Sequence, residues 1–184
     1  PRGSYTMETL LIKTGGLIPK LSVGLTENFS FGVSFGIQNL IGDENPKINK
    51  PTPEVQVRYR VFEESQTMPA LVYGLDTQGR GYYNDSVQII NDNTIAINRY
   101  EQKAWGMYMV MSKNWNFLGN LGFHLGINKS LSENSDGDND YNLFFGSDKE
   151  LNRSFSLLIE YDAALNDNDY QLNDTSFGQG KGYL

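Results

Sequence analysis

The clearest structural pattern in the sequence is Phe29-Ser30-Phe31-Gly32-Val33-Ser34-Phe35-Gly36-Ile37-Gln38. Its odd-numbered residues are large and apolar, whereas its even-numbered residues are small or polar. Because successive side chains of a β-strand point to opposite faces, this alternation predicts a strand with one apolar face and one polar face.

The same period of two recurs along the chain, and helical periodicity is hard to find. Further strands are predicted at residues 121–130, 55–61 and 155–162, and by weaker patterns at 5–13, 20–26, 70–78, 104–112 and 141–148. The pattern therefore predicts about nine strands, most of them near the ~9–11 residues with which a tilted strand crosses a bilayer.

The connections between these strands alternate in length. Short ones are expected at residues 26–28, 64–68, 114–116 and 149–153, and long polar ones at 41–54, 79–103, 132–140 and 166–181. Outer-membrane barrels have tight periplasmic turns and extended outer loops. We therefore predict an all-β, antiparallel, up-and-down transmembrane β-barrel that forms a single domain over residues 1–184. Within the longest connection, residues 86–90 and 94–97 flank a turn and predict a projecting hairpin.

Composition narrows the classes of function. The chain carries 22 Asp+Glu against 15 Lys+Arg, a net charge of -7, which disfavours binding to nucleic acid. It has no cysteine, so disulfides and thiolate metal sites are excluded. No apolar run approaches the ~20 residues of a spanning helix. The first residues do not form a signal peptide. An even, closed barrel would need at least one further strand, so we expect either that the chain continues beyond Leu184 or that other segments close the barrel.

Several stretches resemble a known family. They are residues 23–34, 39–42, 69–79 and 160–167. Together they look like the predicted outer-membrane β-barrels related to YjbH, which are associated with exopolysaccharide production. The resemblance implies an outer-membrane barrel in a diderm bacterium, with closing strands after the last residue, and it transfers no catalytic or ligand residue.

The polar faces of the predicted strands are the place to look for a site. If the apolar faces meet lipid, the interior of the barrel receives a polar network of Arg58, Arg60, Asp76, His124, Glu160 and Asp162. In a narrow barrel such charges form a structural ion-pair network that fills the interior. The alternative is a selectivity constriction in a small pore.

Signals for catalysis or for a cofactor are weak. His124 is the single histidine and reads as a hydrogen-bonded interior residue, because neither a His-x-Ser pair nor a Gly-x-Ser-x-Gly elbow is present. Asp136, Asp138 and Asp140 offer carboxylates to calcium, but Tyr141 stands where a calcium loop needs its glycine, so a solvated loop tip is expected. We expect no enzyme activity, no cofactor and no bound metal.

Aromatic residues are predicted to form girdles at the two membrane surfaces. They are Trp105, Tyr108, Trp115, Phe117 and Tyr161.

Three functions remain open. The first is a structural or transport barrel, a small pore or a surface anchor, whose partners are outer-membrane lipid and lipopolysaccharide, with other envelope proteins or polysaccharide as further candidates. The second is a soluble all-β binding module, lipocalin-like or lectin-like, with its apolar faces turned inward. The third, which has the least support, is a barrel enzyme that acts on lipid or glycan.

Overall fold

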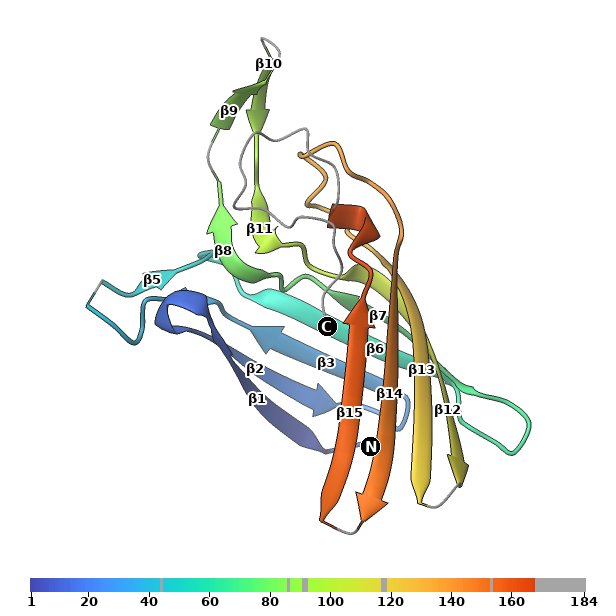
Figure 1. The fold of residues 1–184 in the computed structure, drawn as a ribbon. Coiled ribbons are helices and arrows are strands. Elements are labelled where there is room, and N and C mark those ends of the chain that lie inside the picture. The colour runs from blue at the N-terminus through green and yellow to red at the C-terminus, as the bar shows by residue number, and fades with distance from the viewer. Residues whose placement is uncertain (44, 86, 91–92, 117–118, 153, 168–184) are drawn as a thin grey trace.

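The fold is seen in a computed structural model that describes residues 1–43, 45–85, 87–90, 93–116, 119–152 and 154–167 (Figure 1). Almost all regular structure in these residues is β-strand, apart from the short 3-10 helices η1 (Lys13–Gly15) and η2 (Leu165–Asp167). The strands are β1 (Tyr5–Ile12), β2 (Gly16–Gly24), β3 (Phe29–Ser34), β4 (Ile37–Gln38), β5 (Lys47–Ile48), β6 (Glu54–Phe62), β7 (Ala70–Asp76), β8 (Arg80–Asn84), β9 (Val87–Ile90), β10 (Asn93–Ala96), β11 (Arg99–Gln102), β12 (Gly106–Asn116), β13 (Asn120–Lys129), β14 (Asn142–Asn152) and β15 (Phe155–Asp162).

The main sheet has 11 strands in the order β15-β14-β13-β12-β7-β6-β3-β2-β4-β5, and β1 pairs with β2. Every ladder in it is antiparallel, and the long strands lie beside their neighbours in sequence, so the predicted all-β antiparallel meander is confirmed. The hairpin predicted within residues 86–97 is confirmed as β9 paired with β10. Strands β8 and β11, which lead into and out of this hairpin, also pair with each other. The two pairs together project from one end of the sheet (Figure 1).

The predicted alternation of loop lengths is also confirmed up to residue 167, whereas most of the long connection predicted at 166–181 lies outside the described residues. Short connections join β2 to β3, β6 to β7, β12 to β13 and β14 to β15, whereas residues 77–105 and 130–141 form long connections at the opposite end. Two turns were predicted at the wrong place. Residues 114–116 belong to β12, where Trp115 pairs with Leu121, and residues 149–152 belong to β14. The polar sequence there suggested turns, but cross-strand pairing extends both hairpins beyond it.

Register gives the main sheet two chemically different faces. Cross-strand partners point to the same face, and Val23 lies opposite Phe31, which lies opposite Val57. The apolar face carries large side chains that are between 39% exposed (Ile127) and 51% exposed (Leu125). Its residues are Leu21, Val23, Phe31, Tyr59, Tyr73, Met107, Met109, Met111, Trp115, Phe123, Leu125, Ile127, Leu143, Phe145, Leu157, Ile159 and Tyr161.

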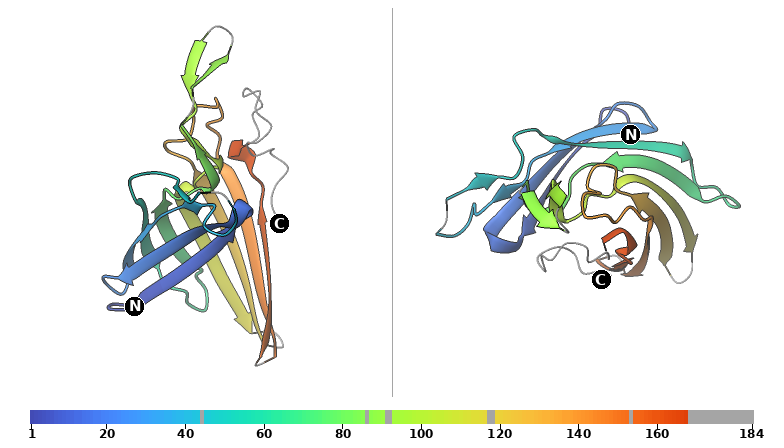
Figure 2. Two further views of the ribbon diagram at one scale, coloured as in Figure 1. Left: turned by 90° about the vertical axis from the view of Figure 1, so that its left-hand side faces the viewer. Right: turned by 90° about the horizontal axis from the view of Figure 1, so that it is seen from above.

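The polar face lies on the opposite side of the same strands. Its residues include Ser22, Ser30, Gln56, Arg58, Asp76, Tyr108, Ser112, His124, Asn128, Asn142, Asp148, Glu160 and Asp162. Figure 2 shows the sheet curving like an open trough, with the long connections gathered over its hollow side. Polar-face residues hydrogen-bond to this end of the molecule, since Asn128 donates to the Trp105 carbonyl and Asn142 accepts from the Leu165 N–H of η2. The polar face is therefore the concave one and the apolar face is convex.

Glycines on the polar face make room for aromatic rings. A Cβ atom at Gly74 would come within 2.3 Å of the Tyr108 ring, and one at Gly126 within 2.0 Å of the Phe144 ring. The Tyr108 and Phe144 rings can therefore lie flat against the concave side because the residue beside each ring on the neighbouring strand is a glycine without a side chain.

The hydrophobic core lies beneath the long connections. Ile97, Tyr100, Ala104 and Ala164 are at most 3% exposed, and all lie at this end of the molecule. We call residues 97–105, 130–141 and η2 the loop cap.

The sheet does not close on itself. In the described part of the chain no ladder joins β15 to β1, so the outer edge of each remains unpaired. The prediction of an antiparallel sheet holds, while its closure into a barrel is not seen.

Candidate functional site

His124 lies on β13 between two polar partners on the neighbouring strands. Its Nδ1 atom is 2.8 Å from Ser112 Oγ on β12, and its Nε2 atom is 2.7 Å from Asp148 Oδ1 on β14. The side chains of His124 and Asp148 are 33% and 35% exposed. The expectation of a hydrogen-bonded histidine is therefore met, but Ser112 and Asp148 were not predicted as its partners.

Asp76 forms a separate cluster at the end of β7. Lys20 donates to Asp76 Oδ2 at 3.3 Å, while Gln56 Nε2 and the Gln78 backbone N–H donate to Oδ1 at 3.2 and 2.9 Å. Ser34 lies next to this cluster, since it accepts from Gln56 and donates to Gln78. Asp76 is thus the acceptor that ties β2, β6 and β7 together on the polar face.

Asp162 fastens η2 to the sheet. Its Oδ1 accepts from Asn142 Nδ2 at 2.6 Å and from the Ala164 backbone N–H at 2.9 Å. Asn142 in turn donates to Asn128 Oδ1 and accepts from the Leu165 backbone N–H. These contacts hold the start of η2 against β14 and β13.

The other predicted polar-face residues are not part of these clusters. Arg60 pairs with Glu63 at 2.7 Å and donates to Asn28 Oδ1 at 3.1 Å, so it stabilises the short-turn end. Arg58 and Glu160 are exposed and form no ion pair with a described residue. The structure therefore does not join the six predicted residues into one network; it distributes them over the polar face.

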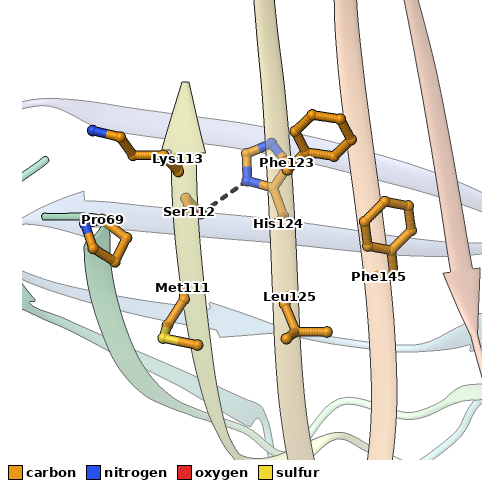
Figure 3. A pocket seen from close by; sticks show the side chains of 8 residues that line it. All are labelled: Pro69, Met111, Ser112, Lys113, Phe123, His124, Leu125 and Phe145. Carbon is orange, nitrogen blue, oxygen red and sulfur yellow. Dashed lines mark hydrogen bonds between the residues drawn. The ribbon is translucent and has the colours of Figure 1, made fainter. Parts of the chain in front are cut away.

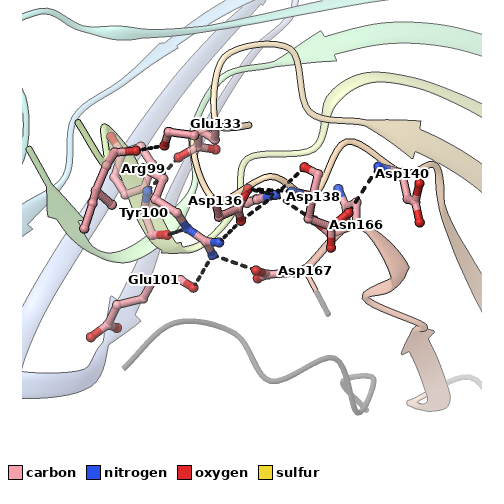
Figure 4. A network of polar contacts seen from close by, with 12 residues as sticks. Arg99, Tyr100, Glu101, Glu133, Asp136, Asp138, Asp140, Asn166 and Asp167 are labelled. Carbon is pink, nitrogen blue, oxygen red and sulfur yellow. Dashed lines mark hydrogen bonds and ion pairs between the residues drawn. The ribbon is translucent and has the colours of Figure 1, made fainter. Parts of the chain in front are cut away.

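The strongest ionic cluster lies in the loop cap (Figure 4). Arg99 binds Asp136 through Nη1 and Asp167 through Nη2, the latter at 2.7 Å. Lys103 Nζ lies 2.7 Å from Asp136 Oδ2. The Arg99, Lys103 and Asp136 side chains are each 2% exposed and that of Asp167 is 5% exposed, so the charges compensate one another away from water.

Glu133 supplies a second anchor in the cap. Its carboxylate accepts from the Tyr100 backbone N–H at 2.6 Å and from the Ala104 backbone N–H at 2.5 Å. Burial raises the pKa of Glu133 to about 7, against the lowering effect of these two N–H groups and of Arg99. Burial also raises the pKa of Asp167.

Glu54 connects the cap to the sheet. Tyr100 donates its hydroxyl to Glu54 Oε1 at 2.9 Å, and Thr77 donates to Oε2 at 2.5 Å. Lys50 Nζ lies 2.6 Å from the same carboxylate. Burial and the nearby Glu54 charge raise the pKa of Tyr100 well above its usual value, so this phenol stays a proton donor.

The acidic loop differs from its expected role. Asp136 and Asp138 are 2% and 4% exposed, so the expectation of a solvated loop tip is wrong for both. Lys103 explains the burial, because its ammonium group donates to Asp136 Oδ1 and to the Asp138 carbonyl, each at 2.9 Å. Across the described residues no group of three His, Cys, Asp or Glu side chains is arranged to hold a metal ion.

The aromatic residues that were predicted to form girdles divide between the two faces of the sheet. Trp115 and Tyr161 lie on the apolar face, 48% and 45% exposed. Tyr108 is 8% exposed and lies on the polar face. Trp105 stacks on Phe144, another polar-face residue, with ring centroids 4.7 Å apart. Phe117 lies outside the described residues.

A shallow apolar pocket lies at β12–β14, at the same level of the sheet as the Ser112–His124 pair (Figure 3). It is lined by Pro69, Met111, Ser112, Lys113, Phe123, His124, Leu125 and Phe145. Met111, Leu125 and Phe145 belong to the apolar face, so the pocket gives that face a local depression and no polar binding site.

Sequence reasoning missed Ser112, Asp148 and the buried charges of the cap. Ser112 and Asp148 have the parity of the polar face, which could have marked them as candidates. A hairpin centred on Trp115, as the predicted turn implied, would have set His124 against Gly106, whereas the observed register sets it against Ser112. The misplaced turn therefore hid the pair.

In the described part of the chain, no helix has the length and apolar character to cross a membrane. No protein family, curated protein or solved structure matches this chain.

Proposed function

We propose that this chain forms the wall of an outer-membrane β-barrel with a structural or transport role, as the family resemblance implies. The observation that carries the proposal is the polarity of the curved sheet. Its convex face is mainly apolar, with Lys113, Ser147 and Lys149 as polar exceptions, while most polar side chains and the loop cap occupy the concave side. A water-soluble protein usually turns the apolar face of a sheet toward a core, and large exposed apolar patches mark interaction surfaces.

The strand dimensions agree with a bilayer as the partner of this face. β6 and β2 have 9 residues each, β13 has 10, and β12 and β14 have 11. These lengths match the ~9–11 residues of a tilted membrane strand. Short connections at one end and the loop cap at the other reproduce the asymmetry of such barrels.

The unpaired edges of β1 and β15 fit the same proposal. Strand edges cannot remain unpaired in hydrocarbon, because no water is there to satisfy the backbone groups. A barrel wall therefore requires further strands at these edges, supplied by the same polypeptide or by another.

The two tryptophans allow a direct test. Trp115 is 48% exposed on the apolar face, whereas Trp105 stacks on Phe144 on the concave side. The chain is reconstituted into vesicles whose acyl chains carry bromine, which quenches tryptophan fluorescence on contact. We expect strong quenching in Trp105→Phe, which retains Trp115, and weak quenching in the matched Trp115→Phe, which retains Trp105.

Equal quenching in the two variants, or none in either, would contradict insertion through the apolar face. Dispersion without detergent, with no shift in gel mobility on boiling, would favour the soluble binding module instead. In that case the apolar face would pack against another protein surface.

A further inference from the structure

A hydrogen-bonded line of serine, histidine and aspartate crosses β12, β13 and β14 on the polar face. Ser112 Oγ lies 2.8 Å from His124 Nδ1, and Asp148 Oδ1 lies 2.7 Å from His124 Nε2. An ionised carboxylate can only accept, so Nε2 carries the ring proton and Nδ1 is left to accept from the Ser112 hydroxyl. A nucleophile next to a base that a third group orients is the constellation of covalent acyl transfer.

We propose that Ser112 is a nucleophile that cleaves carboxylic esters, with His124 as general base and Asp148 as the residue that orients it. The inference does not depend on membrane insertion. In the first step Ser112 Oγ attacks the ester carbonyl carbon, and its proton passes to His124 Nδ1. The C–O bond to the alcohol then breaks, and the alcohol leaves with that proton. Water, deprotonated by His124 Nδ1, then attacks the acyl carbon. The bond from the acyl group to Ser112 Oγ breaks, the carboxylic acid leaves, and the proton on His124 returns to Ser112 Oγ.

His124 is not covered by a side chain from the strand position opposite it. That position on β14 is Gly146, where an added Cβ atom would lie 3.5 Å from His124 Cβ. The places beside Gly122 and Gly126 are filled by Asp148 and by the Phe144 ring. With about a third of the His124 and Asp148 side chains exposed, an ester can reach the line from the concave side.

Strand pairing restricts the substrate class. At Ser112, β12 pairs with His124 on one side and with Ala70 on the other. The backbone N–H groups at this position therefore belong to the ladders and do not form an oxyanion hole, a feature whose loss costs about 10²–10³-fold in rate in serine hydrolases. We accordingly expect turnover of activated esters, such as aryl esters, and no cleavage of amides.

The test is covalent labelling with a fluorophosphonate, carried out on the full chain in detergent micelles. We expect one label, which peptide mapping assigns to Ser112, and none in Ser112→Ala. His124→Asn and Asp148→Asn should be labelled more slowly, by about 100-fold where the general base is lost. Ser30→Ala, which removes another polar-face hydroxyl, is the matched control and should be labelled at the wild-type rate.

Histidine NMR gives a second readout, because His124 is the only histidine. Its ¹⁵N resonances should show the Nε2–H tautomer in the wild type and move in Asp148→Asn. Absence of labelling, a label that persists in Ser112→Ala, or an Nδ1–H tautomer would each overturn the proposal. Circular dichroism of every variant shows whether a lost label reflects lost folding, and a misfolded alanine variant is replaced by Ser112→Thr, whose branched hydroxyl should label more slowly.

Discussion

Replacing Glu133 with glutamine should remove much of the pH dependence of the stability of the loop cap. Glu133 is 3% exposed and holds the backbone N–H groups of Tyr100 and Ala104. The positive charge of Arg99 favours the ionised form of the Glu133 carboxyl, and the negative charge of Glu54 disfavours that form. Burial outweighs the favourable contacts, so the folded carboxyl keeps its proton up to a pH of about 7 rather than 4.5.

The sign and size of the effect follow from this difference in pKa. Between pH 4.5 and 7 the folded state binds a proton that the unfolded state has released, so stability falls as pH rises. The contribution of Glu133 to the free energy of unfolding is fully present below pH 4.5 and is lost above about pH 7. At about 1.4 kcal/mol per pKa unit, the loss amounts to about 3 kcal/mol.

Urea unfolding of the cap between pH 4.5 and 8 measures this effect. Trp105, which stacks on Phe144 beside the cap, is the reporter in a Trp115→Phe background. The wild type should lose about 3 kcal/mol over this range, and Glu133→Gln should lose much less. The substitution also places an amide N–H₂ where an acceptor is needed, so it should cost about 1–3 kcal/mol at low pH. A Glu133→Gln variant that keeps the full wild-type slope between pH 5 and 7 would refute the assignment.

The remaining predictions concern the ionic cluster, the packing of the polar face and the apolar face. Arg99→Ala leaves Asp136 and Asp167 without their shared partner and should cost about 3–5 kcal/mol in urea unfolding; Arg58→Ala, at an exposed arginine, should stay within about 0.5 kcal/mol of wild type. Gly126→Val forces side-chain atoms into the Phe144 ring and should cost about 1–3 kcal/mol or more, whereas Gly146→Ala, with its nearest neighbour at 3.5 Å, should be nearly neutral in the same assay. Leu125→Arg on the apolar face should make insertion into vesicles less favourable by about 2–4 kcal/mol; a change within about 0.5 kcal/mol, the value typical of a water-exposed site, would argue against contact with lipid.

The strands and their two faces could be predicted because alternation is a local property of the chain. The predicted strand at residues 155–162 coincides with β15, and the odd-numbered residues of 29–34 point to the apolar face as expected. The lengths of the connections are likewise local, so the sorting of short and long connections was predictable.

The sites depended on tertiary structure. His124 could be assigned to the polar face from parity, but its partners depend on the register of two hairpins, and an error of a few residues in one turn changes the partner. In the loop cap, too, the partners of the charged side chains could not be predicted from the sequence. Asp136 stands in an acidic, loop-like stretch that suggests solvent exposure, yet Arg99 and Lys103 hold it at 2% exposure.

Local alternation along each strand assigns the side chains to two faces, because it depends only on the two-residue repeat of an extended backbone. The hollow face, the buried charges and the partners across strands follow from the folded chain, because curvature, register and loop packing arise from contacts between segments far apart in the sequence.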